Sequence, residues 1–217
     1  MDERELIQRT ADHVKDAMAG DSSGHDWWHV YRVWQTAIRL ASQMEANLTV
    51  VELGALLHDI ADWKLHDGDV EIGPRVAREW LESLKAHPEI VDRVTGIIAG
   101  LSFAGAGVPD KACSIEAQIV QDADRLDALG AVGIGRTFAF GGAHHRLMYD
   151  PEIRPVYHDN FESYKSSASP TINHFYEKLF LLKDRMHTAA GREMAEGRHQ
   201  YMVDFVNRFY MEFDGKI

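Results

Sequence analysis

Apolar residues recur at intervals of three and four along most of the chain, which is the spacing of helices with one buried face. The clearest case is the segment at about 26–44, where Val30 and Val33 begin a continuous apolar stripe. The segment at about 50–61 is apolar on nearly every side. Such a segment predicts a helix at the centre of the core.

The same spacing predicts further helices on both sides of these two segments. They are expected at about residues 2–18, 72–86, 88–99, 111–128, 134–140 and 171–211. Strand-like alternation of useful length is absent, so the predicted fold is all-α, a single-domain helical bundle spanning residues 1–217. Loops are predicted at 62–69, 102–110 and 143–169, and the last is long enough to be a lid, an interface or a disordered segment.

The composition is that of an ordinary globular chain with an acidic surface. Of 217 residues, 45% are apolar and 26% charged, and the net charge is −11. So acidic a protein repels polyanions, which excludes non-specific binding to nucleic acids or anionic membranes. The N-terminus has no signal-peptide pattern and no apolar run is long enough to span a membrane, so a cytoplasmic location is predicted. The lone cysteine, Cys113, agrees with a reducing compartment.

The dipeptide His58-Asp59 is the strongest local indication of chemistry. It stands near the end of the apolar segment at 50–61. An unpaired carboxylate buried there is strongly unfavourable, so the pair must be hydrogen-bonded, ion-paired or bound to a metal. Neighbouring helical residues point about 100° apart, so these two side chains can bind one ion only near the end of the helix.

Two other groups of polar residues lie on predicted helices. His25, His29 and Arg32 are spaced i, i+4 and i+7, so they share one face that offers two possible ligands and a cation. Asp124 and Asp127 are spaced i and i+3 on a later helix that is otherwise rich in apolar residues. Carboxylates on such a helix also require partners.

The order of these residues resembles that of the HD-domain superfamily of metal-dependent phosphohydrolases, whose pattern is H…HD…D on a helical bundle. The matching positions are His29, His58, Asp59 and Asp124. The flanking segments 25–29 and 122–130 are similar to those of small stand-alone bacterial members. The resemblance covers about residues 21–160, and the helices expected at 171–211 would pack on this core.

The resemblance implies one divalent cation held by these four side chains. Manganese is favoured, with iron, cobalt, nickel, zinc or magnesium as alternatives. Such an ion polarises a phosphoryl oxygen and lowers the pKa of bound water. Further histidines at the spacing of binuclear members are missing, which favours a single metal ion.

Residues near the expected metal ligands are candidates for binding substrate and transferring protons. Arg32, Lys64 and His25 are expected to bind the phosphorylated substrate. Asp62 is the first candidate for the general base and Asp67 is the second. Asp127 is expected to orient Arg125 or a ligand histidine.

The predicted function is therefore metal-dependent hydrolysis of a small phosphorylated molecule, with a nucleotide as the expected substrate. Either phosphate or pyrophosphate would be released. The alternatives are a non-catalytic regulatory module that binds a metal and a nucleotide, and a helical scaffold with an HD dipeptide by chance. A homodimer is possible. Trp27, Trp28 and Trp34 are interpreted as core or pocket-wall residues rather than a base-stacking surface.

Overall fold

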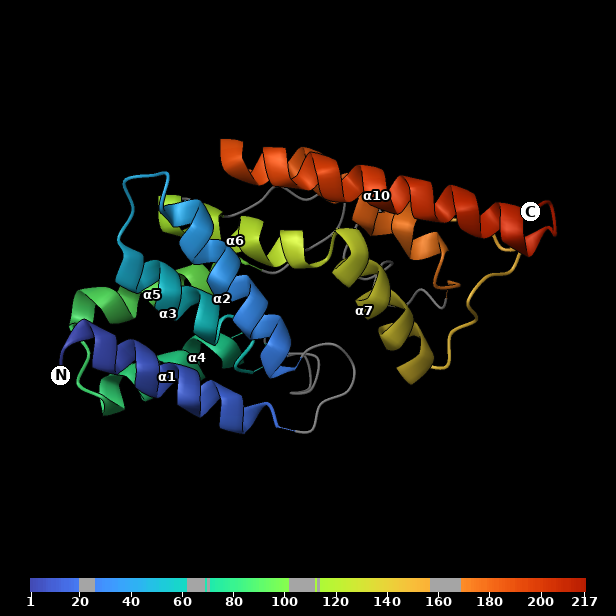
Figure 1. Cartoon of the computed structure of the whole chain (residues 1–217). Coiled ribbons are helices and arrows are strands. Elements are labelled where there is room, and N and C mark those ends of the chain that lie inside the picture. The colour runs from blue at the N-terminus through green and yellow to red at the C-terminus, as the bar shows by residue number, and fades with distance from the viewer. Residues whose placement is uncertain (20–25, 62–68, 70, 102–111, 113, 157–168) are drawn as a thin grey trace. The chain divides into compact units, whose positions relative to one another are not determined.

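The computed structural model describes residues 1–19, 26–61, 69, 71–101, 112, 114–156 and 169–217. Throughout these ranges the chain forms helices and no strand, which confirms the all-α prediction. The described residues up to Asp124 form one compact unit, and those from Arg125 onward form a second (Figure 1). The single domain expected over 1–217 remains a prediction. No helix in the described ranges is long and apolar enough to cross a membrane.

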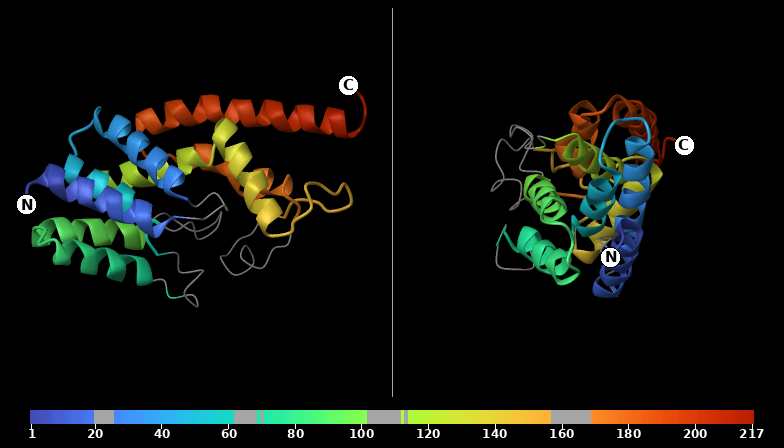
Figure 2. Two further views of the ribbon diagram at one scale, coloured as in Figure 1. Left: turned by 60° about the horizontal axis from the view of Figure 1, so that its bottom comes forward. Right: turned by 90° about the vertical axis from the view of Figure 1, so that its left-hand side faces the viewer.

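The first unit is built around one central helix. Its helices are α1 (Glu3–Ala17), α2 (Trp27–Ala41), α3 (Leu48–Leu57), α4 (Ile72–Ser83), α5 (Pro88–Gly100) and most of α6 (Ile115–Asp127). Helix α3 packs against α1, α2 and α5, and α4 packs against α5 (Figure 2). The central position predicted for the most apolar segment is therefore observed.

Close packing around α3 depends on a small residue at its centre. All residues of α3 except its first, Leu48, and Glu52 are buried. A methyl group added to Gly54 would lie 3.3 Å from Ile97 Cδ1 and 3.4 Å from Val120 Cγ2. Glycine at this position thus lets α5 and α6 approach the backbone of α3, which places α6 beside the end of α3 where the HD dipeptide follows.

The second unit contains two long helices and a chain of short helical turns. Its elements are α7 (Gly130–Ala143), the π-helical turn η2 (Phe175–Leu179), α9 (Phe180–Leu182), the 3₁₀ turn η3 (Lys183–Arg185) and α10 (Ala189–Phe213). Helix α7 packs against α10. Aromatic rings join the two helices, with Phe138 of α7 lying 6.0 Å from Phe205 and 6.4 Å from Phe209 of α10.

Three element boundaries differ from those predicted. Helix α3 ends at Leu57 rather than near residue 61. Helix α7 begins at Gly130, whose φ of +73° suits a residue without a side chain. The helix expected over 171–211 is broken, because Met186 is extended and Thr188 caps α10 by accepting from the Gly191 amide.

The predicted loops fall partly outside the described residues. Residues 144–156 form no helix or strand, in agreement with the loop predicted to begin at 143. The loop predicted at 102–110, and all of the loop predicted at 62–69 except Asp69, lie outside the described residues.

Candidate metal centre

His29 lies in the first turn of α2 and is placed there by a helix cap. The side chain of Asp26 accepts a hydrogen bond from the His29 backbone amide at 3.0 Å. This bond satisfies one of the amide groups that have no partner at the start of a helix. The imidazole is turned inward, with only 1% of the side chain exposed. The cap therefore fixes the backbone of His29 in the first turn of α2.

His58 and Asp59 follow α3 at its C-terminal end. The Nδ1 atom of His58 lies 2.8 Å from the backbone oxygen of Ala55. A carbonyl oxygen only accepts, so Nδ1 carries the proton in this bond, and the Nε2 atom of the neutral ring holds a lone pair. The helix ends just before this dipeptide, at Leu57. This agrees with the expectation that two adjacent residues can share an ion only near a helix end.

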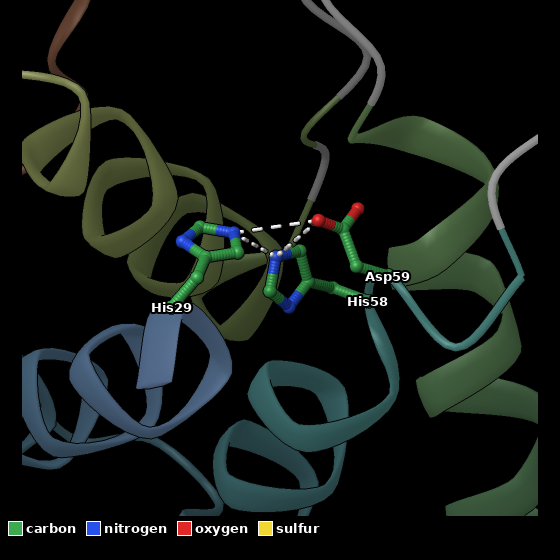
Figure 3. A group of neighbouring side chains, drawn as sticks. All are labelled: His29, His58 and Asp59. Atoms are coloured by element: carbon green, nitrogen blue, oxygen red, sulfur yellow. Dashed lines mark hydrogen bonds and ion pairs between the residues drawn. The ribbon is translucent and has the colours of Figure 1, made fainter. Parts of the chain in front are cut away.

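Four side chains from three helices converge on one point. The Nε2 atoms of His29 and His58 are 3.1 Å apart, and Asp59 Oδ2 lies 3.3 Å from the first and 3.5 Å from the second (Figure 3). Asp124 approaches from α6, with Oδ1 at 3.6 Å from His29 Nε2 and 3.8 Å from His58 Nε2. The histidine side chains are almost fully buried, whereas those of Asp59 and Asp124 are 30% and 37% exposed.

The donor atoms of His29, His58 and Asp59 fit one divalent cation, and Asp124 brings a second carboxylate close to both imidazoles. With bonds of about 2.1 Å, neighbouring ligand atoms are about 3.0 Å apart in an octahedron and about 3.4 Å apart in a tetrahedron. Five of the six separations among the donor atoms run from 3.1 to 3.8 Å, close to the spacing of neighbouring ligands on one ion. Imidazole nitrogen with carboxylate oxygen suits first-row metals. The bond from His58 to a backbone carbonyl is the outer contact that metal-bound histidines usually make.

Two other predicted site residues lie in the described ranges. Arg32 is partly exposed and lies one turn after His29 on α2. Asp127 is buried and accepts a hydrogen bond from Arg136 of α7 at 2.8 Å. Arg125, which Asp127 was expected to orient, donates to a backbone carbonyl of the second unit. The role predicted for Asp127 stays a prediction, and the contact seen is with Arg136.

The remaining predicted site residues lie outside the described residues. They are His25, Asp62, Lys64 and Asp67. Asp62 follows Asp59 by three residues, which would put it one turn further along the same face only if the helix continued. Helix α3 ends at Leu57, so that condition is not met, and helical spacing no longer relates these two carboxylates.

One interpretation of the sequence is corrected in part at the start of α2. Trp28 is expected in the core or in a pocket wall, and its exposure of 59% excludes the core; its neighbour Tyr31 is 39% exposed. The helical period alone could have shown this. Trp28 lies about 160° around the helix from Val30, which is the first residue of the buried stripe.

The fold and this site define an HD-domain protein. The HD domain family model matches residues 27–129, a range that contains His29, His58, Asp59 and Asp124. The chain belongs to this family. It is 37% identical to YpgQ of Bacillus subtilis strain 168, over 99% of this chain and 97% of YpgQ.

Solved structures are similar over almost the whole chain. A HD-superfamily hydrolase from Bacillus thuringiensis is 44% identical, with a TM-score of 0.75 over 98% of this chain and 99% of that protein. A Lactobacillus plantarum protein reaches a TM-score of 0.86 at 32% identity, over 99% and 100% of the two chains. A crystal structure of YpgQ in complex with ADP superposes with a TM-score of 0.77 over 98% and 97%, at 32% identity in that comparison.

Proposed function

We propose that this protein is a metal-dependent phosphohydrolase that acts on a nucleotide and releases phosphate or pyrophosphate. The observation that carries the proposal is the convergence of two buried imidazoles and two carboxylates on one point, from His29, His58, Asp59 and Asp124. The ADP bound in the crystal structure of YpgQ supports a nucleotide as the class of substrate.

The four converging side chains would hold one divalent cation, and Mn²⁺ is favoured. When bound, such an ion supplies a Lewis acid for a phosphoryl oxygen and lowers the pKa of a bound water. Arg32 would donate hydrogen bonds to phosphate oxygens, which suit the planar guanidinium group. Lys64 and His25 are further candidates for this contact from the sequence. Local positive charge is required because the chain as a whole carries −11.

Proton transfer is assigned to carboxylates that follow the HD dipeptide. Asp62 is the first candidate for accepting a proton from the attacking water, and Asp67 is the second. Both assignments come from the sequence. Asp127, which is paired with Arg136, is proposed to position the end of α6 rather than to touch the substrate.

The proposal is tested by incubating the purified, chelator-treated protein with nucleoside mono-, di- and triphosphates, with and without Mn²⁺. Phosphate and pyrophosphate are measured separately, so the bond that is cleaved is identified. We expect turnover only with metal. Asp59→Ala should lower it by at least about 100-fold, because loss even of an outer contact to a metal ligand costs 10–100-fold.

A matched control separates this effect from a general loss of acidic charge. Glu89 is a carboxylate on α5 whose side chain is 70% exposed, and Glu89→Gln should leave turnover unchanged. Full activity in Asp59→Ala would contradict the proposed mechanism. Binding of metal and nucleotide without any turnover would instead favour a regulatory module.

A further inference from the structure

Two exposed aromatic side chains lie on the same turn of α2 as the buried ligand His29. Trp28 immediately precedes His29, and Tyr31 follows two residues later. A single exposed aromatic residue is ordinary on a protein surface. Here the two rings touch, with centroids 5.9 Å apart, and they adjoin the side chain that helps to form the metal centre.

The angular positions of the side chains around α2 show where this aromatic pair lies relative to His29. At about 100° per residue, Arg32 lies about 60° from His29, Trp28 lies about 40° beyond Arg32, and Tyr31 lies about 60° beyond Trp28. Exposure is 1% at the His29 side chain, partial at Arg32 and highest at the aromatic pair. The surface of α2 therefore passes from metal ligand to cation to aromatic rings.

The two rings are set almost at right angles, with 81° between their planes. In such an edge-to-face pair the edge of one ring lies against a single face of the other, so most of the ring area stays uncovered by the partner, and Trp28 is 59% exposed. An open aromatic face bounded by a second ring suits a flat aromatic ligand. Because α2 with its side chains is about 10–12 Å across, the rings and the metal ligand are separated by a distance on the order of 10 Å.

We infer that Trp28 and Tyr31 bind the base of the substrate by stacking, while its phosphates lie at the metal centre and Arg32. A nucleotide carries its phosphates at one end and its base at the other, and around α2 the metal ligand and the cation lie on one side and the aromatic rings on the other. This inference rests on the proposed function, because it takes the substrate to be a nucleoside phosphate. It makes the aromatic pair the part of the site that separates nucleotides from other phosphate compounds.

The test compares a ligand that has a base with one that lacks it. Binding of ADP and of inorganic pyrophosphate is measured by titration calorimetry with Mn²⁺, on wild type, Trp28→Ala, Trp28→Phe and Gln35→Ala. Trp28→Ala should bind ADP about 5–150-fold more weakly, the range expected for losing one base–aromatic stack. Its affinity for pyrophosphate should be unchanged, and Trp28→Phe should restore most of the ADP affinity.

Gln35 is the matched control because it is exposed on the same face of α2, about two turns beyond Trp28. Gln35→Ala should bind both ligands as wild type does. A second measurement uses the emission of the five tryptophans. ADP should quench part of this emission in the wild type, and that part should be missing in Trp28→Phe.

Several results would overturn the inference. They are unchanged ADP affinity in Trp28→Ala, equal weakening of ADP and pyrophosphate, or a wild type that binds ADP no more tightly than pyrophosphate. A change in the solution mass of the protein on Trp28→Ala would assign the rings to contact between chains. Because binding is scored separately from turnover, failure of the hydrolase proposal alone leaves a different pattern, which is selective ADP binding without product.

Discussion

The sharpest prediction concerns Asp124, whose substitution should have opposite effects with and without metal. Asp124→Asn keeps the shape of the side chain and removes its charge. With metal bound at the proposed centre, the change would remove one of the two proposed anionic ligands. In the metal-free protein it removes one of two carboxylates that approach the same imidazole nitrogens.

The size of the metal effect follows from linkage between binding and folding. A ligand present at 100 times its Kd stabilises the folded state by about 2.7 kcal/mol, which for a chain of this size raises Tm by about 5–11 °C. If Asp124→Asn weakens metal binding 10–100-fold, the same metal concentration stabilises the folded state by only about 0.4–1.4 kcal/mol. The expected rise in Tm is then about 1–6 °C.

The effect without metal follows from repulsion between two like charges. Asp59 Oδ2 and Asp124 Oδ1 lie 3.3 and 3.6 Å from the same His29 nitrogen, so they are at most about 7 Å apart. Two unit charges at that distance repel by about 0.6 kcal/mol in a water-like dielectric, and by more where burial is greater. Both carboxylates are about one-third exposed, so the lower figure applies. Metal-free Asp124→Asn should be as stable as wild type or slightly more stable.

The assay is thermal unfolding at pH 8 of chelator-treated wild type, Asp124→Asn and Glu89→Gln, with and without Mn²⁺. Glu89→Gln removes an exposed carboxylate of α5 and should keep the full metal-induced rise. No rise in wild-type Tm with any first-row divalent ion would refute the metal centre. A full rise in Asp124→Asn would remove Asp124 from the ligand set.

Two further predictions use other parts of the structure. Asp26→Ala and Asp2→Ala each remove an N-cap carboxylate, and each should lower the free energy of unfolding by about 1 kcal/mol. Only Asp26→Ala should also reduce the metal-induced rise in Tm, because Asp26 caps the helical turn that holds His29. Burial, together with nearby cationic side chains, lowers the pKa of His174 to about 3. Below pH 6.5 the unfolded chain therefore binds a proton that the folded one does not. In urea unfolding, the free energy of unfolding of the wild type should fall by about 1.4 kcal/mol per pH unit relative to that of His174→Gln as the pH decreases toward 3. Above pH 7 the two proteins should show no such difference.

The sequence was sufficient to predict the core of the first unit, because the strongest patterns lie in its most buried helices. The apolar stripe that begins at Val30 and Val33 faces the interior of α2, and the nearly uniform apolar segment became the central helix α3. The need for a helix end at His58-Asp59 also followed from side-chain directions alone. These features depend on local periodicity, which a single sequence records directly.

Features that depend on contacts between distant segments could not be predicted from local periodicity. No glycine or proline marks the end of α3 at Leu57, and the break before α10 depends on an extended Met186. The approach of Asp124 to two histidines requires α6 to pack beside α3, so only the family resemblance could indicate it. The exposure of Trp28 follows from its position on the helix, about 160° from Val30, whereas apolar character alone points to the interior.

The charges at the proposed metal centre predict that metal and nucleotide should bind cooperatively. Asp59 and Asp124 together carry −2, and a divalent cation neutralises them without leaving a surplus. Without metal this pair repels a phosphate group, and Arg32 alone offsets only half of their charge. With metal bound there, the guanidinium group proposed to contact the phosphates would leave the centre net positive, although the whole chain carries −11. Metal should therefore strengthen nucleotide binding, and by thermodynamic linkage nucleotide must strengthen metal binding by the same factor.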